Sequence, residues 1–225
     1  MAVNKIFDMR KAIIFDFDGV IVDSFSNAFI TYKEICRQLQ KPFPFTNIDS
    51  FQDWYDSFWP ENFRRLGITD AEEVQRGENI FRETLPQLEA PLFAGMDIVL
   101  QELARQYPLA LVSANYKEEI EQKLAHYQLR SLFSAVIPSN GTVKPNPAQF
   151  YKAMQELNIS PEETASVGDM AKDVLTGINA GLLENIAVSY GWAPLPKLKR
   201  ELRELKIEPT AILHSPSELL DYFRS

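Results

Sequence analysis

Short apolar runs alternate with longer amphipathic segments along most of the chain. Segments of helical periodicity separate most of the runs, and this alternation is typical of βαβ units with a parallel sheet. The pattern therefore predicts an α/β fold with a doubly wound, parallel, Rossmann-like sheet. The expected strands lie at 11–16, 108–113, 134–137, 164–168, 186–190 and, more weakly, 210–213.

The stretch 24–88 breaks this alternation, because it has helix-period patterns and polar turns but no convincing strand. Aromatic residues recur in it at helical spacing between Phe51 and Phe63. They could line a pocket, although a small helical module needs large apolar side chains for its own core. The sequence thus predicts a helical insertion at 24–88 within a core formed by 1–23 and 89–225.

Two carboxylates end the first apolar run, IIFDFDGV. Asp16 and Asp18 are one residue apart, and Gly19 closes the turn. Side chains alternate along a strand, so both carboxylates can point the same way, at the strand end where open α/β sheets bind ligands. Two like charges this close favour a cation or a shared proton nearby. The alternative is an ordinary strand end followed by an Asp-Gly turn.

Three later segments carry further candidate groups. Ser113 follows an apolar run, Lys144 precedes a proline, and Asp169 and Asp173 are separated by one helical turn. Each has an ordinary alternative when taken alone: a strand-end serine, a solvated lysine, and carboxylates at a helix N-terminus. Their combination is more informative than any one of them.

The four motifs together resemble those of the haloacid dehalogenase superfamily, in its phosphatase branch with a small helical cap, near phosphoglycolate phosphatase and β-phosphoglucomutase. The resemblance runs from residue 16 to residue 173 and is specific because four separated motifs coincide in order. It implies that 24–88 is a helical cap domain inserted after the first strand of a Rossmann-like catalytic core.

By this resemblance Asp16 is the nucleophile that forms an aspartyl-phosphate, and Asp18 is the general acid and base. Ser113 and Lys144 would bind the phosphoryl oxygens. In the family an Asn often follows the serine directly, but here Ala114 intervenes, so Asn115 receives no phosphate-binding role.

The resemblance also implies a Mg²⁺ cofactor, for which hard carboxylate oxygens are suitable ligands. Asp169 is expected to bind the metal directly, and Asp173 directly or through the outer shell. The expected metal-site residues are Asp16, Asp18, Asp169 and Asp173.

The implied activity is hydrolysis of a small phosphorylated metabolite, by a phosphoric monoester hydrolase similar to phosphoglycolate phosphatases. An acidic residue at Asp18 favours a phosphatase or a phosphomutase over a dehalogenase. Two alternatives stay open: a phosphomutase of the β-phosphoglucomutase type, and a catalytically silent binding protein of the same fold. The histidine expected of such a phosphomutase is missing near Asn27, which argues against the first alternative. The intact set of motifs argues against a silent binding protein.

The composition of the chain excludes some classes of binding partner. A net charge of -8 argues against nucleic acid, because no surplus of basic residues is present to replace its counterions. The single cysteine, Cys36, rules out an intrachain disulfide, fits a reducing compartment and is expected to be a buried apolar residue. We find no apolar run long enough for a bilayer and no signal-like N-terminus, so we expect a cytoplasmic protein without a membrane partner. The substrate and the oligomeric state are not evident from the sequence.

Two charged segments have competing interpretations. Arg64 and Arg65 could bind an anionic leaving group, although solvated helix charges are commoner. The segment 197–206 (KLKRELRELK) predicts a solvated helix with ion pairs at i,i+4.

Overall fold

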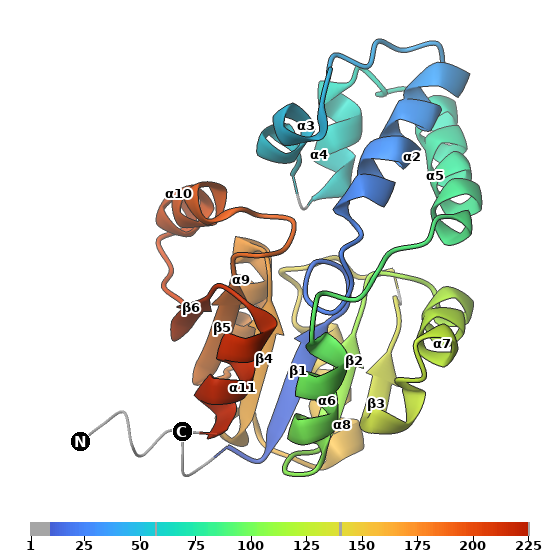
Figure 1. Ribbon diagram of the computed structural model, residues 1–225. Coiled ribbons are helices and arrows are strands. Elements are labelled where there is room, and N and C mark those ends of the chain that lie inside the picture. The colour runs from blue at the N-terminus through green and yellow to red at the C-terminus, as the bar shows by residue number, and fades with distance from the viewer. Residues whose placement is uncertain (1–9, 57, 140, 225) are drawn as a thin grey trace. The chain divides into compact units, whose positions relative to one another are not determined.

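A computed structural model describes residues 10–56, 58–139 and 141–224. It contains a six-stranded sheet of order β3-β2-β1-β4-β5-β6, in which every neighbouring pair is parallel (Figure 1). The predicted parallel α/β sheet is therefore confirmed. Its strands are β1 (Ala12–Asp16), β2 (Leu109–Val112), β3 (Phe133–Ile137), β4 (Thr164–Gly168), β5 (Glu184–Val188) and β6 (Ala211–Leu213).

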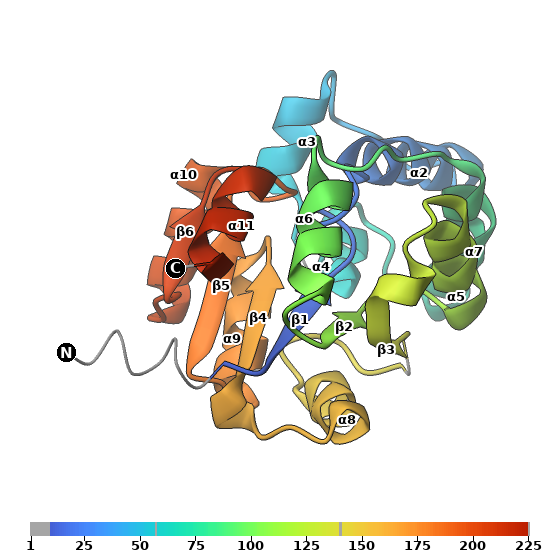
Figure 2. The same cartoon turned by 60° about the horizontal axis from the view of Figure 1, so that its bottom comes forward.

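Helices cover both faces of the sheet. Helices α8 and α9 pack on one face, while α6 and α11 pack against each other on the opposite face (Figure 2). The helices of this part of the chain are α6 (Met96–Ala104), α7 (Lys117–His126), α8 (Ala148–Leu157), α9 (Ala171–Asn179), α10 (Leu195–Leu205) and α11 (Pro216–Arg224), with 3₁₀ turns η2 (Arg130–Leu132) and η3 (Pro161–Glu163).

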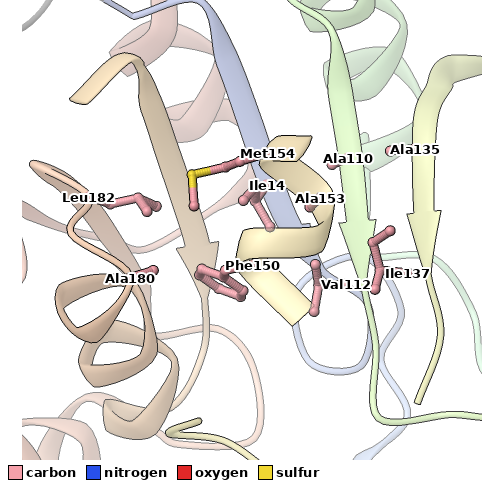
Figure 3. Close-up of a cluster of buried hydrophobic side chains, with 10 residues drawn as sticks. All are labelled: Ile14, Ala110, Val112, Ala135, Ile137, Phe150, Ala153, Met154, Ala180 and Leu182. Atoms are coloured by element: carbon pink, nitrogen blue, oxygen red, sulfur yellow. The ribbon is translucent and has the colours of Figure 1, made fainter. Parts of the chain in front are cut away.

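The inward side of α8 packs against the sheet and forms an apolar core with it (Figure 3). Phe150, Ala153 and Met154 of α8 meet side chains from β1, β2 and β3, and all three are at most 4% exposed. Burial of such side chains stabilises a fold by about 1.5–3 kcal/mol for each large residue. The other members of this cluster are Ile14, Ala110, Val112, Ala135, Ile137, Ala180 and Leu182.

The chain divides into two compact units, with boundaries between Val22 and Asp23 and between Pro91 and Leu92. The sheet belongs to the first unit. The described residues of the second unit, 23–91, form helices and no strand, as the sequence pattern predicts. Its helices are α2 (Phe25–Gln38), α3 (Ile48–Trp54), α4 (Trp59–Arg65) and α5 (Ala71–Thr84), with a 3₁₀ turn η1 (Leu85–Gln87).

Aromatic side chains form the core of the second unit. Phe51 is fully buried, and Tyr55 and Phe63 are also buried, whereas Phe58 is exposed. Phe51, Tyr55 and Phe63 are therefore core residues, as the aromatic spacing predicts, whereas Phe58 is not. Phe51 lies in α3 and Phe63 in α4, while Tyr55 and Phe58 lie between these two short helices. The rings that contact Phe51 are Phe25, Phe29, Tyr32, Phe43, Phe45, Trp54 and Tyr55.

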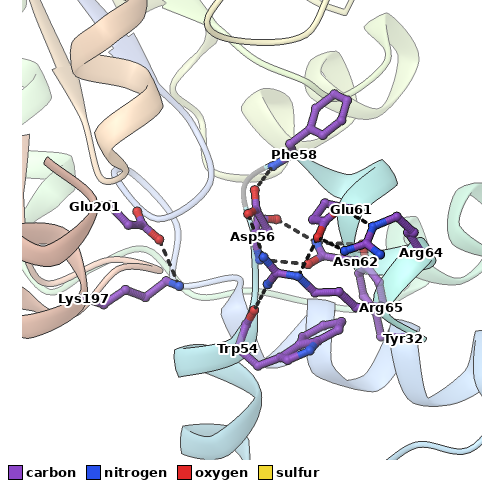
Figure 4. Close-up of polar contacts among 10 residues, drawn as sticks. All are labelled: Tyr32, Trp54, Asp56, Phe58, Glu61, Asn62, Arg64, Arg65, Lys197 and Glu201. Atoms are coloured by element: carbon purple, nitrogen blue, oxygen red, sulfur yellow. Dashed lines mark hydrogen bonds and ion pairs between the residues drawn. The ribbon is translucent and has the colours of Figure 1, made fainter. Parts of the chain in front are cut away.

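A polar network holds α4 to the residues that follow α3 (Figure 4). The fully buried Asn62 amide accepts from Asp56 N at 2.8 Å and donates to Asp56 O at 2.7 Å. Arg65 donates to Trp54 O at 2.8 Å and to Glu61 at 2.9 Å. Arg64 is bound to Glu61 at 2.6 and 2.7 Å with its side chain 67% exposed, as expected of a solvated helix charge.

Helix α10 differs from its predicted solvated character at one position. The Lys197 side chain is only 6% exposed, and its Nζ lies 3.0 Å from Glu201 one turn later (Figure 4). The predicted i,i+4 pair is present, but its lysine is turned inward. An amphipathic pattern alone does not distinguish this lysine from its solvated neighbours.

Cys36 is buried in α2, as predicted, and burial raises the pKa of its thiol to about 11. Among the described residues, no helix is long and apolar enough to cross a membrane.

A buried ion pair ties the start of β1 to the start of β5. Arg10 Nε donates to Glu184 Oε2 at 2.7 Å, and Tyr222 Oη donates to Glu184 Oε1 at 2.8 Å. The Arg10 guanidinium also lies 4.5 Å from the Phe223 ring centroid. Both charged side chains are at most 4% exposed.

We expect Arg10→Met to destabilise the first unit by about 3–5 kcal/mol, because it leaves the Glu184 carboxylate buried without its cation. The neighbouring Lys11→Met is the matched control, since its partner Glu163 forms an exposed pair with a 63% exposed lysine. Urea unfolding followed by circular dichroism measures both. Equal losses for the two variants would contradict the energetic importance of the buried pair.

We expect Arg65→Ala to destabilise the second unit by about 0.5–1.5 kcal/mol, because the hydrogen bond from Arg65 to Trp54 O is lost. Arg64→Ala should leave stability nearly unchanged, since its only described partner is the exposed pair with Glu61. Unfolding followed by fluorescence reports on this unit when both variants are made in a Trp192→Phe background, which leaves Trp54 and Trp59 as the tryptophans. A larger loss for Arg64→Ala than for Arg65→Ala would contradict this assignment.

Candidate active site

The strand register brings the predicted site residues to one edge of the sheet. Asp16 at the end of β1 is paired with Val112 of β2, so Ser113 is the next residue on the neighbouring strand. On the other side Phe15 pairs with Val167 of β4, which places Asp169 two residues beyond that pair. The carboxyl ends of parallel strands therefore gather these side chains at the point where the strand order reverses around β1.

Lys144 joins two of the carboxylates. It lies on the loop between β3 and α8, and its Nζ is 3.0 Å from Asp16 Oδ1 and 2.6 Å from Asp173 Oδ1. The second oxygen of Asp173 accepts from Met170 N at 2.9 Å, at the start of α9. Gly168 makes room for this arrangement, since a Cβ there would lie 2.1 Å from Asp173 Cβ.

The electrostatics of the cluster reflect its burial. Burial raises the pKa of Asp16 to about 7, with Lys144 opposing the shift and Asp173 adding to it. Burial, followed by the charges of Asp173 and Asp16, raises the pKa of Asp169 well above its usual range. Burial lowers the pKa of Lys144, but the two carboxylates it contacts outweigh this, so the net shift is upward and the ammonium stays charged.

One carboxylate oxygen from each of Asp16, Asp169 and Asp173 lies within 4.8 Å of the other two. Lys144 balances one of the three carboxylates, so two negative charges remain when all are ionised. Hard, closely spaced carboxylate oxygens with this surplus fit a divalent cation such as Mg²⁺. Asp18, the fourth expected metal residue, is not part of this group of three.

Asp18 instead contacts Asn115, for which the sequence predicts no role in the site. Asn115 Nδ2 donates to Asp18 Oδ2 at 2.7 Å, and Asn115 is 8% exposed. Ala114 separates Asn115 from Ser113, yet Asn115 reaches the site through this hydrogen bond. The feature of the sequence that indicates Asn115 is its position three residues after the end of β2, a strand that neighbours β1.

Ser113 is 1% exposed and is held by its backbone. Its carbonyl accepts from Gln149 Nε2 of α8 at 3.0 Å, and the same amide donates to Pro138 O at 2.9 Å. The Ser113 hydroxyl oxygen accepts from Asn115 N at 3.1 Å, which leaves its proton to be donated elsewhere. The buried Gln149 is a second residue that the sequence reasoning did not identify.

The segment after β5 also reaches the site. Trp192 N donates to Asp169 Oδ2 at 2.5 Å. Because the donor is a backbone group, no side-chain motif indicates this contact. The position of β5 next to β4 in the sheet is the feature that predicts it.

Comparisons with known proteins identify the family of the chain. The family model of haloacid dehalogenase-like hydrolases matches residues 13–187. A phosphoglycolate phosphatase of Synechococcus elongatus is 30% identical, with 93% of this chain and 95% of that protein covered. The pyrophosphatase PpaX of Bacillus mycoides is 26% identical at the same coverage.

Among solved structures, the haloacid dehalogenase-like family protein SP0104 of Streptococcus pneumoniae has the same fold, with a TM-score of 0.82 and 22% identity. The alignment covers 96% of this chain and 99% of that one. With the family match over most of the chain, these observations show that the protein belongs to the haloacid dehalogenase-like hydrolases.

Proposed function

We propose that the protein is a Mg²⁺-dependent phosphatase that hydrolyses a small phosphorylated metabolite through an aspartyl-phosphate on Asp16. The observation that carries the proposal is the contact of Asp16 with the charged Lys144, beside Asp18 at the carboxyl edge of the sheet. A carboxylate nucleophile, a carboxyl group placed for proton transfer and a fixed cation are the groups that phosphoryl transfer requires.

In the first half of the reaction, an Asp16 oxygen forms a bond to phosphorus while the bond from phosphorus to the leaving oxygen breaks. Asp18 donates its proton to that oxygen, and Asn115 keeps the carboxyl group in position through its amide. Lys144 and the Ser113 hydroxyl stabilise the charge on the equatorial phosphoryl oxygens.

In the second half, a water molecule attacks the phosphorus of the aspartyl-phosphate. Asp18, now ionised, accepts the proton from that water, and the bond between phosphorus and the Asp16 oxygen breaks. Inorganic phosphate and the original carboxylate result, so the site returns to its starting state.

Asp16 and Asp169 are the residues that we propose as direct ligands of Mg²⁺. Both oxygens of Asp173 already accept hydrogen bonds, from Lys144 and from Met170 N, so we propose that Asp173 orients Lys144 from outside the metal shell. The chemistry that bound Mg²⁺ supplies is neutralisation of negative charge between the Asp16 carboxylate and the phosphate.

The proposed substrate class follows the relatives, which are named for phosphoglycolate and pyrophosphate hydrolysis. Both names describe a phosphoryl group on a small anion. In this proposal Asp16, Ser113 and Lys144 bind the phosphoryl group that all such substrates share, and the unit 23–91 selects the leaving group. A cytoplasmic location is consistent with such a metabolite substrate.

We expect removal of divalent cations with a chelator to abolish phosphatase activity, and Mg²⁺ to restore it. Mg²⁺ should also raise the thermal unfolding midpoint, since a ligand at 100 times its dissociation constant stabilises the folded state by about 2.7 kcal/mol. Asp169→Asn should lose this rise. Full activity in rigorously metal-free protein would overturn the metal requirement.

We expect Asp16→Asn and Asp18→Asn to fail at different steps. Asp16→Asn should yield no phosphorylated protein in mass spectra of acid-quenched reactions. Asp18→Asn should slow turnover by about 10²–10⁴-fold for an alkyl phosphate, with a smaller loss for an aryl phosphate whose leaving group needs no proton.

The matched control is Asp97→Asn, an exposed carboxylate in the first turn of α6, which should keep wild-type turnover. Near wild-type turnover by Asp16→Asn would contradict the nucleophile assignment. Equal losses on the two substrates for Asp18→Asn would contradict its role as proton donor.

A further inference from the structure

Three consecutive residues after β5 contact two separate parts of the site within the first unit. Tyr190 Oη donates to Val20 O at 3.2 Å, in the turn that follows Asp18. The Tyr190 ring also packs edge-on against Phe93, with 4.8 Å between ring centroids. This residue therefore anchors the segment to the turn at 17–22.

The next residue, Gly191, lies at a point of very close approach. A Cβ at Gly191 would be 2.1 Å from Gly19 O and 2.6 Å from Asp169 Cβ. Distances below 3.0 Å are not compatible with a real Cβ, and Gly19 O is a backbone atom that cannot turn aside. Any side chain at 191 must therefore displace the turn, the Asp169 carboxylate or the segment itself.

Gly19 is constrained from the other side of the same contact. Its φ is +78°, and a Cβ there would lie 2.0 Å from Asp169 Oδ2 and 2.8 Å from Trp192 Cδ1. The turn, the Asp169 carboxylate and the segment after β5 therefore pack directly against one another. This packing is possible because Gly19 and Gly191 have no side chains.

The third residue, Trp192, completes the arrangement. Its backbone N–H donates to Asp169 Oδ2, and Asp169 is 2% exposed. This bond commits one carboxylate oxygen to a backbone donor and restricts the rotation of the carboxylate. Outer contacts of this kind orient a metal ligand and contribute to metal affinity.

We propose that Tyr190, Gly191 and Trp192 form a positioning segment that orients Asp169 toward the cation and holds it in register with the turn that carries Asp18. The inference rests on the proposed Mg²⁺ site, and it adds three positioning residues to it. The segment contacts no reacting atom, so its effect is exerted through Asp169 and through the 17–22 turn.

The test measures Mg²⁺ affinity of the full-length protein by isothermal titration calorimetry. Gly191→Ala should raise the dissociation constant by about 10–100-fold, the usual effect of losing an outer contact to a metal ligand. Gly177→Ala is the matched control, because its Cβ would lie 1.7 Å from Asn185 Oδ1, a comparable collision elsewhere in the first unit. The control should lower the thermal unfolding midpoint but keep the affinity within about twofold of wild type.

A second pair of variants keeps the test decisive if Gly191→Ala does not fold. Tyr190→Phe removes the bond to Val20 O and retains the ring against Phe93. Tyr222→Phe removes a comparable hydroxyl bond, to Glu184, at the amino edge of the sheet. The dissociation constant should rise only for Tyr190→Phe.

The outcomes separate this inference from the proposed function. Wild-type Mg²⁺ affinity in Gly191→Ala would overturn the positioning role and leave the phosphatase assignment intact. If Gly191→Ala does not fold, the same result in Tyr190→Phe would have this consequence. A loss of affinity in these variants supports it even if the natural substrate is something other than a phosphomonoester, because the readout is binding. Absence of Mg²⁺ binding by the wild-type protein would overturn the metal site and this inference together.

Discussion

The first unit depends on one constraint: Asp16, which is half-buried, and the buried Asp169 and Asp173 each place one carboxylate oxygen within 4.8 Å of the others. Such groups repel one another and lose hydration, so each must be held by a donor or a cation. Lys144 binds two of them, Met170 N binds one of these two again, and Trp192 N binds the third. The sheet register, the start of α9 and the loops after β3 and β5 all deliver these donors to the same edge.

Much of this arrangement was predictable because it depends on residue type and order. Apolar runs bounded by turns predict the strands, and alternation with helices predicts a parallel sheet whose carboxyl ends meet. Once that edge is expected, Asp16, Ser113 and Asp169 must lie near it, since each follows an apolar run. The order of the motifs predicted Lys144 as a site residue. Its distance from Asp16, however, depends on the conformation of a loop, which hydrophobic periodicity does not predict.

The remaining contacts escaped prediction for identifiable physical reasons. The Trp192 contact uses a backbone N–H, which every residue except proline possesses, so residue identity carries no signal. The role of Asn115 depends on the path of the loop after β2, where Ala114 separates Asn115 from Ser113. The inward turn of Lys197 and the binding of Arg65 to Trp54 O likewise depend on tertiary packing, because the same residues on an isolated helix would be solvated.

Helix α8 contributes both to the apolar core and, through Gln149, to the site. One side of this helix fills the apolar core with Phe150, Ala153 and Met154, while the Gln149 amide binds the carbonyls of Ser113 and Pro138. A change that rotates or shifts α8 to improve packing would therefore also move a phosphoryl-binding candidate. Attempts to engineer a more thermostable variant by repacking this core would alter the geometry of the site through a single amide, and the two properties cannot be adjusted independently on this face of the sheet.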